Sequence, residues 1–307
     1  MTDLKNISPS FAQKFTQHQL SGEQQITPLI LEGQYKQAYE TLLDAYNAGL
    51  YAGIVGPVGS GKTALCRKFA EDHDRGFSWV TFSDLIRPSS LIGTFDPTLV
   101  FKLGYDIDSF IPGPFTLAAV EGRIFFANEV NRGEEYVLNA LLDALEERRL
   151  YIPQLKTWIE LDEKFYFIAA MNPSDLRGTR VLPEAFKDRI RVWITLEYPK
   201  KEVELKIIKV NCPELNLSES ALETVLKIIT ATRTTLGITK PASIRTSIGF
   251  AKLLGERVRR LNREPNLKDF KEVASLILIQ NLEFNPSITP LQMIDEIVLK
   301  AWNNGKN

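Results

Sequence analysis

The 307-residue sequence has little of the residues that mark secreted and metal-binding proteins. Its two cysteines are Cys66 and Cys212, its two histidines are His18 and His73, and none of the four stands in a ligand spacing. Two cysteines cannot build the disulfide framework of a small secreted domain. We therefore expect both to be reduced thiols in a cytosolic protein, and we assign no role to the histidines.

An excess of charge and long apolar runs are also missing. Lys and Arg number 37 and Asp and Glu 38, so the formal net charge is -1. Proteins that bind the phosphates of nucleic acid usually have more basic than acidic residues. This chain does not, so its composition gives no strong indication of nucleic-acid binding. No stretch approaches the roughly 18 apolar residues of a membrane span, and the first 20 residues hold no apolar signal segment. These absences predict a cytoplasmic protein.

Short apolar runs alternate with helical patterns through the first two thirds of the chain. The runs occupy residues 51–55, 79–82, 124–127, 165–170 and 192–196, and a helical pattern covers 26–47. Because the runs are continuous rather than alternating, they predict buried strands. Strands separated by helices predict an α/β fold, a parallel sheet covered by helices on both faces.

The pattern becomes purely helical after Tyr198-Pro199. Apolar stripes run through 222–229 and 250–261, and Thr289-Pro290 opens a last helix with a capping box. We predict two domains. The first is an α/β domain over residues 1–197, whose first 25 residues are mostly polar, and the second is a small helical domain over 198–307.

One motif with a definite chemistry follows the first strand. Residues 56–63, here called the phosphate loop, match GxxxxGK[ST] as Gly56-Pro57-Val58-Gly59-Ser60-Gly61-Lys62-Thr63. Its glycines let backbone N–H groups converge on phosphate oxygens, and the following helix N-terminus adds positive potential. Lys62 would neutralise the β- and γ-phosphates and Thr63 would offer a hydroxyl to Mg²⁺. The motif predicts binding of ATP with Mg²⁺.

A second strand ends in polar side chains that such a site requires. The run 124–127 leads directly into Asn128 and Glu129. Glu129 is placed to orient and deprotonate the attacking water. The alternative is that Glu129 is an ordinary solvated carboxylate at a strand end.

Several segments, taken in order, resemble the MoxR-type AAA+ ATPases, which form part of the helix-2-insert AAA+ branch. Residues 124–132, Ile-Phe-Phe-Ala-Asn-Glu-Val-Asn-Arg, are similar to the family's second Walker motif, and Met171-Asn172-Pro173 to its sensor 1. The segment 182–189 resembles the one that carries the arginine finger. Ala242-Ser243-Ile244-Arg245 resembles the sensor-2 helix. The resemblance spans roughly residues 26–284 and includes 82–93, 113–116 and 121–122.

The resemblance implies an AAA+ sheet domain followed by a helical lid, assembled as a homo-hexameric ring. Arg189 of one subunit would reach the γ-phosphate bound by its neighbour, and Arg245 would reach it from the lid of the same subunit. Residues 94–115 would hold the helix-2 insert and 149–161 a hairpin before sensor 1. Members of the family usually act with a von Willebrand factor A domain protein and remodel or assemble other complexes.

Each assignment carried over from the family has a plainer alternative. Asn172 could be a turn former, and Arg245 could pair with an acid of the lid. Arg189 could be a surface arginine that pairs with Asp188, and Ile190 stands where the family usually has Phe. Rival candidates for the arginine finger lie nearby, namely Arg177, Arg180 and Arg191.

One departure from the family bears on the chemistry. Asn128 stands where the family has the aspartate on the magnesium side. An amide accepts a hydrogen bond from a metal-bound water but carries no charge. The substitution predicts retained nucleotide binding and slow hydrolysis.

The sequence therefore predicts an ATPase whose cycle rearranges a protein partner. One alternative is an assembly scaffold that binds ATP and hydrolyses it weakly, which Asn128 favours. A second is a nucleic-acid motor, which the balanced charge opposes. The guanine-reading motif NKxD is missing from the sequence, which argues against a GTPase.

Overall fold

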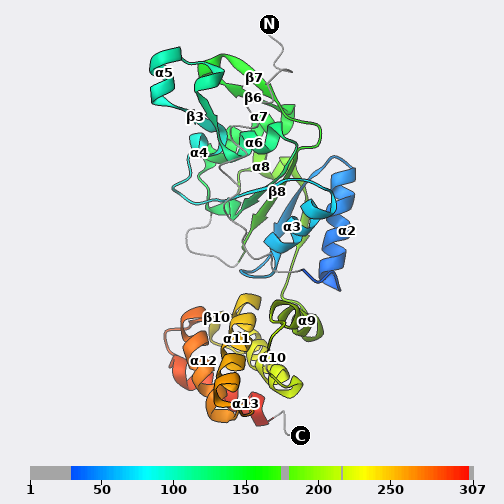
Figure 1. Cartoon of the computed structure of the whole chain (residues 1–307), viewed down its shortest axis with the longest axis vertical. Coiled ribbons are helices and arrows are strands. Elements are labelled where there is room, and N and C mark those ends of the chain that lie inside the picture. Colours follow the sequence, from blue (N-terminus) through cyan, green and yellow to red (C-terminus); the bar gives the residue numbers. More distant parts are fainter. Residues whose placement is uncertain (1–28, 174–179, 216, 304–307) are drawn as a thin grey trace. The chain divides into compact units, whose positions relative to one another are not determined.

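The computed structural model describes residues 29–173, 180–215 and 217–303 (Figure 1). The described chain divides into two compact units. The sheet unit comprises Gln37–Gly56 and Lys62–Thr195. The helical unit comprises everything from residue 196 onward, together with residues 29–36 and Pro57–Gly61. The predicted polar segment 1–25 lies outside the described residues.

A five-stranded parallel sheet forms the centre of the sheet unit. Its strands follow the order β2 (Phe77–Thr81), β5 (Ile124–Asn128), β8 (Tyr166–Met171), β1 (Tyr51–Val55) and β9 (Ile190–Thr195). Every neighbouring pair is parallel. The prediction of a parallel sheet is confirmed, and the predicted strands agree with these bounds to within two residues.

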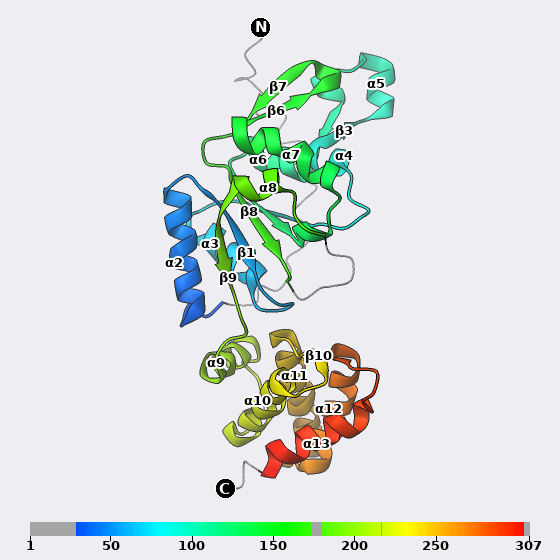
Figure 2. The ribbon, with the colours of Figure 1, turned by 180° about the vertical axis from the view of Figure 1, so that it is seen from behind.

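Helices cover both faces of this sheet, as predicted. On one face Phe125 and Phe167 stack with ring centroids 5.8 Å apart and join a core with α6 (Pro114–Val120), α7 (Glu135–Glu147) and α8 (Glu184–Arg189). On the other face lies α3 (Lys62–Asp72), whose Arg67 stacks on Phe77 of β2. Helix α2 (Gln34–Asn47) packs on α3 through Tyr39 and Phe69 (Figure 2).

Helix α2 begins later than predicted. The pattern indicated a helix from residue 26, but the described chain turns at Gly33, where φ is 55°, and becomes helical at Gln34. A positive φ is incompatible with a continuing right-handed helix, so the glycine sets this boundary.

Two excursions extend one end of the sheet unit (Figures 1 and 2). The first runs through α4 (Pro88–Ile92), β3 (Gly93–Phe95), α5 (Pro97–Leu103), a short 3₁₀ turn at Ile107–Ser109 and β4 (Phe110–Pro112), with β3 and β4 antiparallel. The second is an antiparallel hairpin of β6 (Arg149–Ile152) and β7 (Thr157–Glu160). The first excursion begins before the segment 94–115 that was predicted to hold an insert and overlaps it, and the second lies within the predicted hairpin 149–161.

The helical unit is a bundle around a buried core that includes Phe250, Phe270 and Ile294. Its helices are α9 (Lys201–Asn211), α10 (Glu219–Thr234), α11 (Ile244–Leu261), α12 (Leu267–Asn281) and α13 (Pro290–Asn303). The predicted helical domain is confirmed, but the prediction missed a short antiparallel pair of β10 (Ile238–Lys240) and β11 (Glu283–Phe284). Leu261, predicted as part of an apolar stripe, is 40% exposed at the end of α11.

Two further features of the described residues concern the cysteines and the lengths of the helices. Cys66 and Cys212 are free, buried thiols, and burial raises the pKa of both. Within the described ranges, none of the helices combines the length and hydropathy that crossing a membrane would require.

Candidate functional site

Three neighbouring strands bring candidate residues to one edge of the sheet. β5 ends at Asn128, β8 is followed by Asn172, and β1 is followed by Gly56. The backbone N–H of Gly56 donates to Met171 O at 3.2 Å, which joins the start of the phosphate loop to the end of β8. Because parallel strands present their carboxyl ends at the same edge, the sheet gathers these residues there, where ligands bind in open α/β sheets.

The phosphate loop turns between β1 and α3 by means of two glycines. The backbone of Gly59 has φ 71° and that of Gly61 φ 96°, conformations that side chains other than glycine rarely adopt. Lys62 opens α3, is only 8% exposed, and donates from Nζ to Gly56 O at 2.6 Å. Amide groups turned in this way form an anion-binding concavity, and the lysine stands at the helix N-terminus beside it.

Glu129 follows β5 in a strained conformation. Its φ and ψ are 55° and 41°, in the left-handed region, although it is not glycine. The carboxylate forms an ion pair with Arg132, with Oε2 2.9 Å from Nε. Left-handed backbone at a non-glycine residue costs about 1–3 kcal/mol and often accompanies function.

The amide of Asn128 is oriented by its neighbour on β2. Nδ2 donates to Thr81 Oγ1 at 3.3 Å, so Oδ1 is the atom left to accept from another group. This geometry assigns the amide oxygen, rather than the amide nitrogen, to any cation at the carboxyl edge.

Oxygen donors at the edge fit a magnesium ion of the kind that nucleotides carry. Mg²⁺ is usually held by one or two protein oxygens together with phosphates and water. Thr63, the second residue of α3, and Asn128 supply a hydroxyl and an amide oxygen. Among the described residues, no group of three His, Cys, Asp or Glu side chains could hold a metal by itself. Two protein oxygens of this kind suit a metal that is bound together with its nucleotide.

Asn172, the predicted sensor 1 residue, is joined to the loop that follows Glu129. It is 5% exposed, and Asn131 Nδ2 donates to its carbonyl oxygen at 3.3 Å. Asn131 is itself buried, and its Oδ1 is without a hydrogen-bond partner in the described part of the chain. Buried amide oxygens are normally satisfied, so this atom marks a place where a polar ligand or water belongs.

Arg189, the predicted arginine finger, lies at the opposite edge of the sheet. It ends α8 immediately before β9, and Ile190 pairs with Tyr51 at the start of β1. One strand of five residues separates this edge from Gly56, or about 16 Å. The guanidinium pairs with Glu146 and with Asp188, the latter at 2.7 Å. Within one chain, Arg189 therefore does not join the residues at the carboxyl edge.

The rival arginines are placed differently. The backbone N–H of Arg180 donates to Asn131 O at 2.7 Å, and its side chain pairs with Glu134. Arg191 is an exposed residue of β9, and Arg177 lies outside the described residues. Of these, Arg180 is the one held beside the loop that follows Glu129.

Arg245, the predicted sensor 2 residue, lies close to the phosphate loop within the helical unit. Ser243 caps α11 by accepting from Thr246 N at 3.3 Å, and Arg245 is the exposed second residue of that helix. A Cβ placed on Gly59 would lie 2.7 Å from Ser243 Cβ, so the loop touches the start of α11. The close contact leaves no room for a side chain at position 59, which is a second reason for glycine there.

Two tyrosines that the sequence reasoning missed hold the phosphate loop. Tyr35 OH donates to Ser60 O at 2.8 Å, and Tyr198 OH donates to Val58 O at 3.2 Å. Tyr35 is separated from the loop by more than 20 residues and lies in a helix, so nothing in the sequence indicated its contact with the loop. Tyr198 stands at the change of pattern that located the domain boundary. Arg132 and Asn131 were also missed as site residues, although both follow Glu129 directly.

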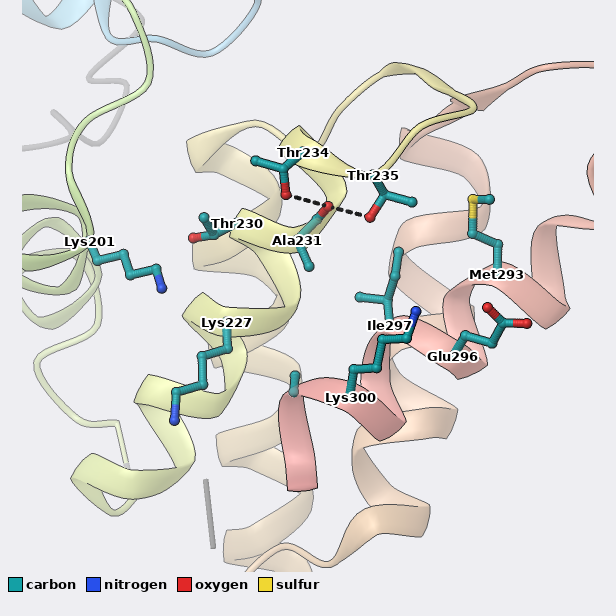
Figure 3. Close-up of a pocket in the computed structure, with 11 residues that line it drawn as sticks. Lys201, Lys227, Thr230, Ala231, Thr234, Thr235, Met293, Glu296, Ile297 and Lys300 are labelled. Atoms are coloured by element: carbon teal, nitrogen blue, oxygen red, sulfur yellow. Dashed lines mark hydrogen bonds between the residues drawn. The ribbon is translucent and has the colours of Figure 1, made fainter. Parts of the chain in front are cut away.

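The helical unit also contains a cavity of about 360 Å³ (Figure 3). It is lined by side chains of α9, α10 and α13, including Lys201, Lys227 and Lys300. No candidate residue from the phosphate loop or from the sheet edge lines it. We therefore do not assign the nucleotide to this cavity.

Known proteins are similar to this chain over the segment that holds the phosphate loop and the sheet. Residues 53–190 match the family model of the AAA domain, dynein-related subfamily. The chain is 24% identical over 200 residues to the gas vesicle ATPase GvpN of Haloferax mediterranei, covering 60% of this chain and 57% of that protein. It is 29% identical over 179 residues to the chaperone MoxR1 of Mycobacterium tuberculosis, covering 58% and 44%. The chain thus spans about half the length of these relatives.

A solved structure supports the fold. A mutant form of RuvB from Thermotoga maritima matches with a TM-score of 0.56 at 16% identity, covering 80% of this chain and 71% of that one. At this identity the likeness concerns the fold alone, a parallel sheet domain followed by helices.

Proposed function

We propose that this chain, which is an AAA+ protein of the MoxR type, binds ATP with Mg²⁺ and hydrolyses it to ADP and phosphate. The observation that carries the proposal is the phosphate loop, with Lys62 buried at its end and two left-handed glycines within it. The match to the AAA domain over residues 53–190 supports it. In this proposal residues 1–197 form the nucleotide-binding domain and 198–307 the lid.

Each candidate residue has a stated role in this proposal. The phosphate loop, above all Gly56, Gly59, Ser60 and Gly61, cradles the phosphates and Lys62 neutralises them. Bound Mg²⁺ would be held by Thr63 and Asn128, and its charge would stabilise the phosphates during transfer. Glu129 orients the attacking water, and Asn172 contacts the γ-phosphate side of the site. Arg245 acts from the lid of the same subunit.

The position of Arg189 supports a ring in which neighbours complete each site. Its guanidinium lies at the sheet edge opposite the phosphate loop, so it can serve only a nucleotide bound by another subunit. We propose a homo-hexamer, the arrangement that the MoxR resemblance implies.

Exposed aromatic side chains support a protein partner. On the first excursion Phe101 is 92% exposed and Tyr105 62%, and on the hairpin Tyr151 and Trp158 are each 42% exposed. Grouped exposed apolar side chains commonly mark interaction sites. The name of MoxR1 describes a chaperone. We propose that the ATP cycle remodels or assembles a protein partner, with a von Willebrand factor A domain protein as the partner class.

Asn128 favours a second candidate function, an assembly scaffold that binds ATP and turns it over slowly. Its amide oxygen keeps one acceptor for the hydrated metal but contributes no charge. Measured turnover separates the two functions, because the scaffold requires binding without substantial hydrolysis.

Calorimetric titration with ATP tests the proposal. Lys62→Ala removes the buried cation of the loop and is expected to abolish binding at micromolar nucleotide. Lys68→Ala is the matched control, because Lys68 lies on the same helix and pairs with Asp72 at the surface. Unchanged affinity in Lys62→Ala would overturn the assignment of the phosphate loop.

A further inference from the structure

The helical unit holds the phosphate loop through a connected set of polar contacts. Tyr35 and Tyr198 donate to the carbonyl oxygens of Ser60 and Val58, at 2.8 and 3.2 Å. Burial raises the pKa of both phenols, so each remains a protonated donor at neutral pH.

Behind Tyr198 lies a buried ion pair. Arg233 places its guanidinium 4.1 Å from the centroid of the Tyr198 ring and binds Glu204 through two parallel hydrogen bonds of 2.7 and 2.8 Å. Glu204 is fully buried and also accepts from Ser247 Oγ at 2.5 Å. The two parallel hydrogen bonds and the stacking on the ring hold the Arg233 guanidinium in one orientation. A lysine at this position could not form both contacts in this way.

The tyrosine contacts decide which way the amides of the loop point. In a trans peptide group the C=O of one residue and the N–H of the next point in opposite directions, and the described chain has no cis peptide bond. Holding Val58 O and Ser60 O toward the tyrosines therefore turns the N–H groups of Gly59 and Gly61 to the other side of the loop. Neither N–H has a hydrogen-bond partner among the described residues.

We propose that Tyr35 and Tyr198 are positioning residues that hold the phosphate loop with the Gly59 and Gly61 amides facing the phosphates, and that Arg233 fixes Tyr198 in that role. This inference rests on the proposed function and deepens it, since it assigns part of the phosphate affinity to side chains outside the GxxxxGK[ST] motif. The glycine conformations require support of this kind, because a flexible glycine does not hold an orientation by itself.

Removing each hydroxyl separately tests the inference. Tyr35→Phe and Tyr198→Phe keep the ring and delete the donor, and the probes are ATP and tripolyphosphate, titrated by calorimetry. Because one hydrogen bond contributes modestly, each variant is expected to weaken binding of both probes by about three- to tenfold. In turnover, KM should rise by a similar factor while kcat stays near its original value. Tyr39→Phe is the matched control, since its hydroxyl donates to Asp72 at 2.9 Å, away from the loop.

Arg233 is tested through its coupling to Tyr198. Arg233→Lys keeps the charge but loses the paired hydrogen bonds to Glu204. It is expected to weaken the binding of both ATP and tripolyphosphate about as much as Tyr198→Phe does. The double variant should show little further loss, because both changes act through the same contact. Additive losses would remove Arg233 from the inference.

Two results would overturn the proposal for the tyrosines. One is unchanged affinity in both single variants and in their double variant. The other is a loss confined to ATP with tripolyphosphate unaffected, which would mean that the rings contact the base instead. Lys62→Ala is measured in the same experiment, because it shows whether the positioning role of the tyrosines or the proposed ATP binding itself is wrong. If Lys62→Ala loses binding while the tyrosine variants keep it, only the positioning role is wrong.

Discussion

Glu129 is held by Arg132, three residues further along the chain, with Oε2 2.9 Å from Nε. The pair closes a left-handed turn at the end of β5, so the side chain proposed to orient water is engaged by a cation. The pair engages one of the two carboxylate oxygens, so in the proposed role Arg132 competes with the attacking water for Glu129. We expect this competition to slow turnover.

Releasing Glu129 should raise basal ATP hydrolysis. The pair is partly exposed, with side chains 28% and 38% accessible, so its contribution is about 1 kcal/mol at most. Arg132→Met is therefore expected to increase kcat by up to about fivefold, with KM for ATP unchanged. A phosphate-release assay measures this, with Arg149→Met as a control because Arg149 pairs at the surface hairpin. A decrease in kcat would show that Arg132 positions Glu129 productively.

Restoring a carboxylate at Asn128 should speed hydrolysis. Loss of a charge-assisted hydrogen bond costs about 1.5–3 kcal/mol, which is about one to two decades in a rate constant. Asn128→Asp is expected to lower the Mg²⁺ concentration for half-maximal activity and to raise turnover at least several-fold. Thr81, which accepts from Asn128 Nδ2, would then have to donate to the new carboxylate. Equal rates in the two proteins would mean that another carboxylate holds the metal, with Glu129 and Asp84 the first to examine.

Mixing two inactive variants tests whether Arg189 acts across an interface. Arginine fingers contribute about 10³-fold or more to rate in other phosphate-loop enzymes, so Arg189→Ala and Glu129→Gln should each be nearly inactive. In a mixed ring, an Arg189→Ala subunit keeps a normal Glu129 and can face the normal Arg189 of a Glu129→Gln neighbour. Activity should recover on mixing. If mixed rings form and stay inactive, the same test with Arg180→Ala examines the rival beside Asn131.

Acid should destabilise the helical unit through Asp269. This buried carboxylate caps α12, accepting from Asn266 N at 2.9 Å and pairing with Arg263 at 2.6 Å. The Arg263 guanidinium holds the pKa of Asp269 below its usual value. A lowered pKa stabilises the folded state above the unfolded pKa, and that stability is lost as pH falls through the folded value.

Asp269→Asn is accordingly expected to lower the free energy of unfolding by about 1–2 kcal/mol at neutral pH. The deficit should shrink as pH falls below about 4. Denaturant unfolding at several pH values measures the difference. Asp295→Asn, which removes a half-exposed partner of Lys271, is the control and should change little. A deficit that does not depend on pH would rule out the ionised carboxylate as its cause.

Local patterns determined much of the fold. Strands β1, β5 and β8 were predicted from continuous apolar runs, because a strand buried on both faces needs apolar side chains at every position. The phosphate loop was identified because its glycines, Lys62 and Thr63 all lie within eight consecutive residues. The prediction and the structure differ at two places. The start of α2 at Gln34 depends on a single turn, and β10 and β11 exist only because each pairs with a strand far away in the sequence.

The sequence by itself determined which residue types could bind ATP and the order of the elements that carry them. Only the tertiary structure decided that the ends of β5, β8 and β1 share one edge while Arg189 lies at the other, because strand order is a property of the sheet. It also decided that Tyr35 and Tyr198 reach the loop and that Arg132 holds Glu129. The tyrosine contacts join residues 25 and 140 positions apart. A sequence pattern shows only residues that are close along the chain. Contacts between distant residues form only when folding brings the intervening segment's two ends together.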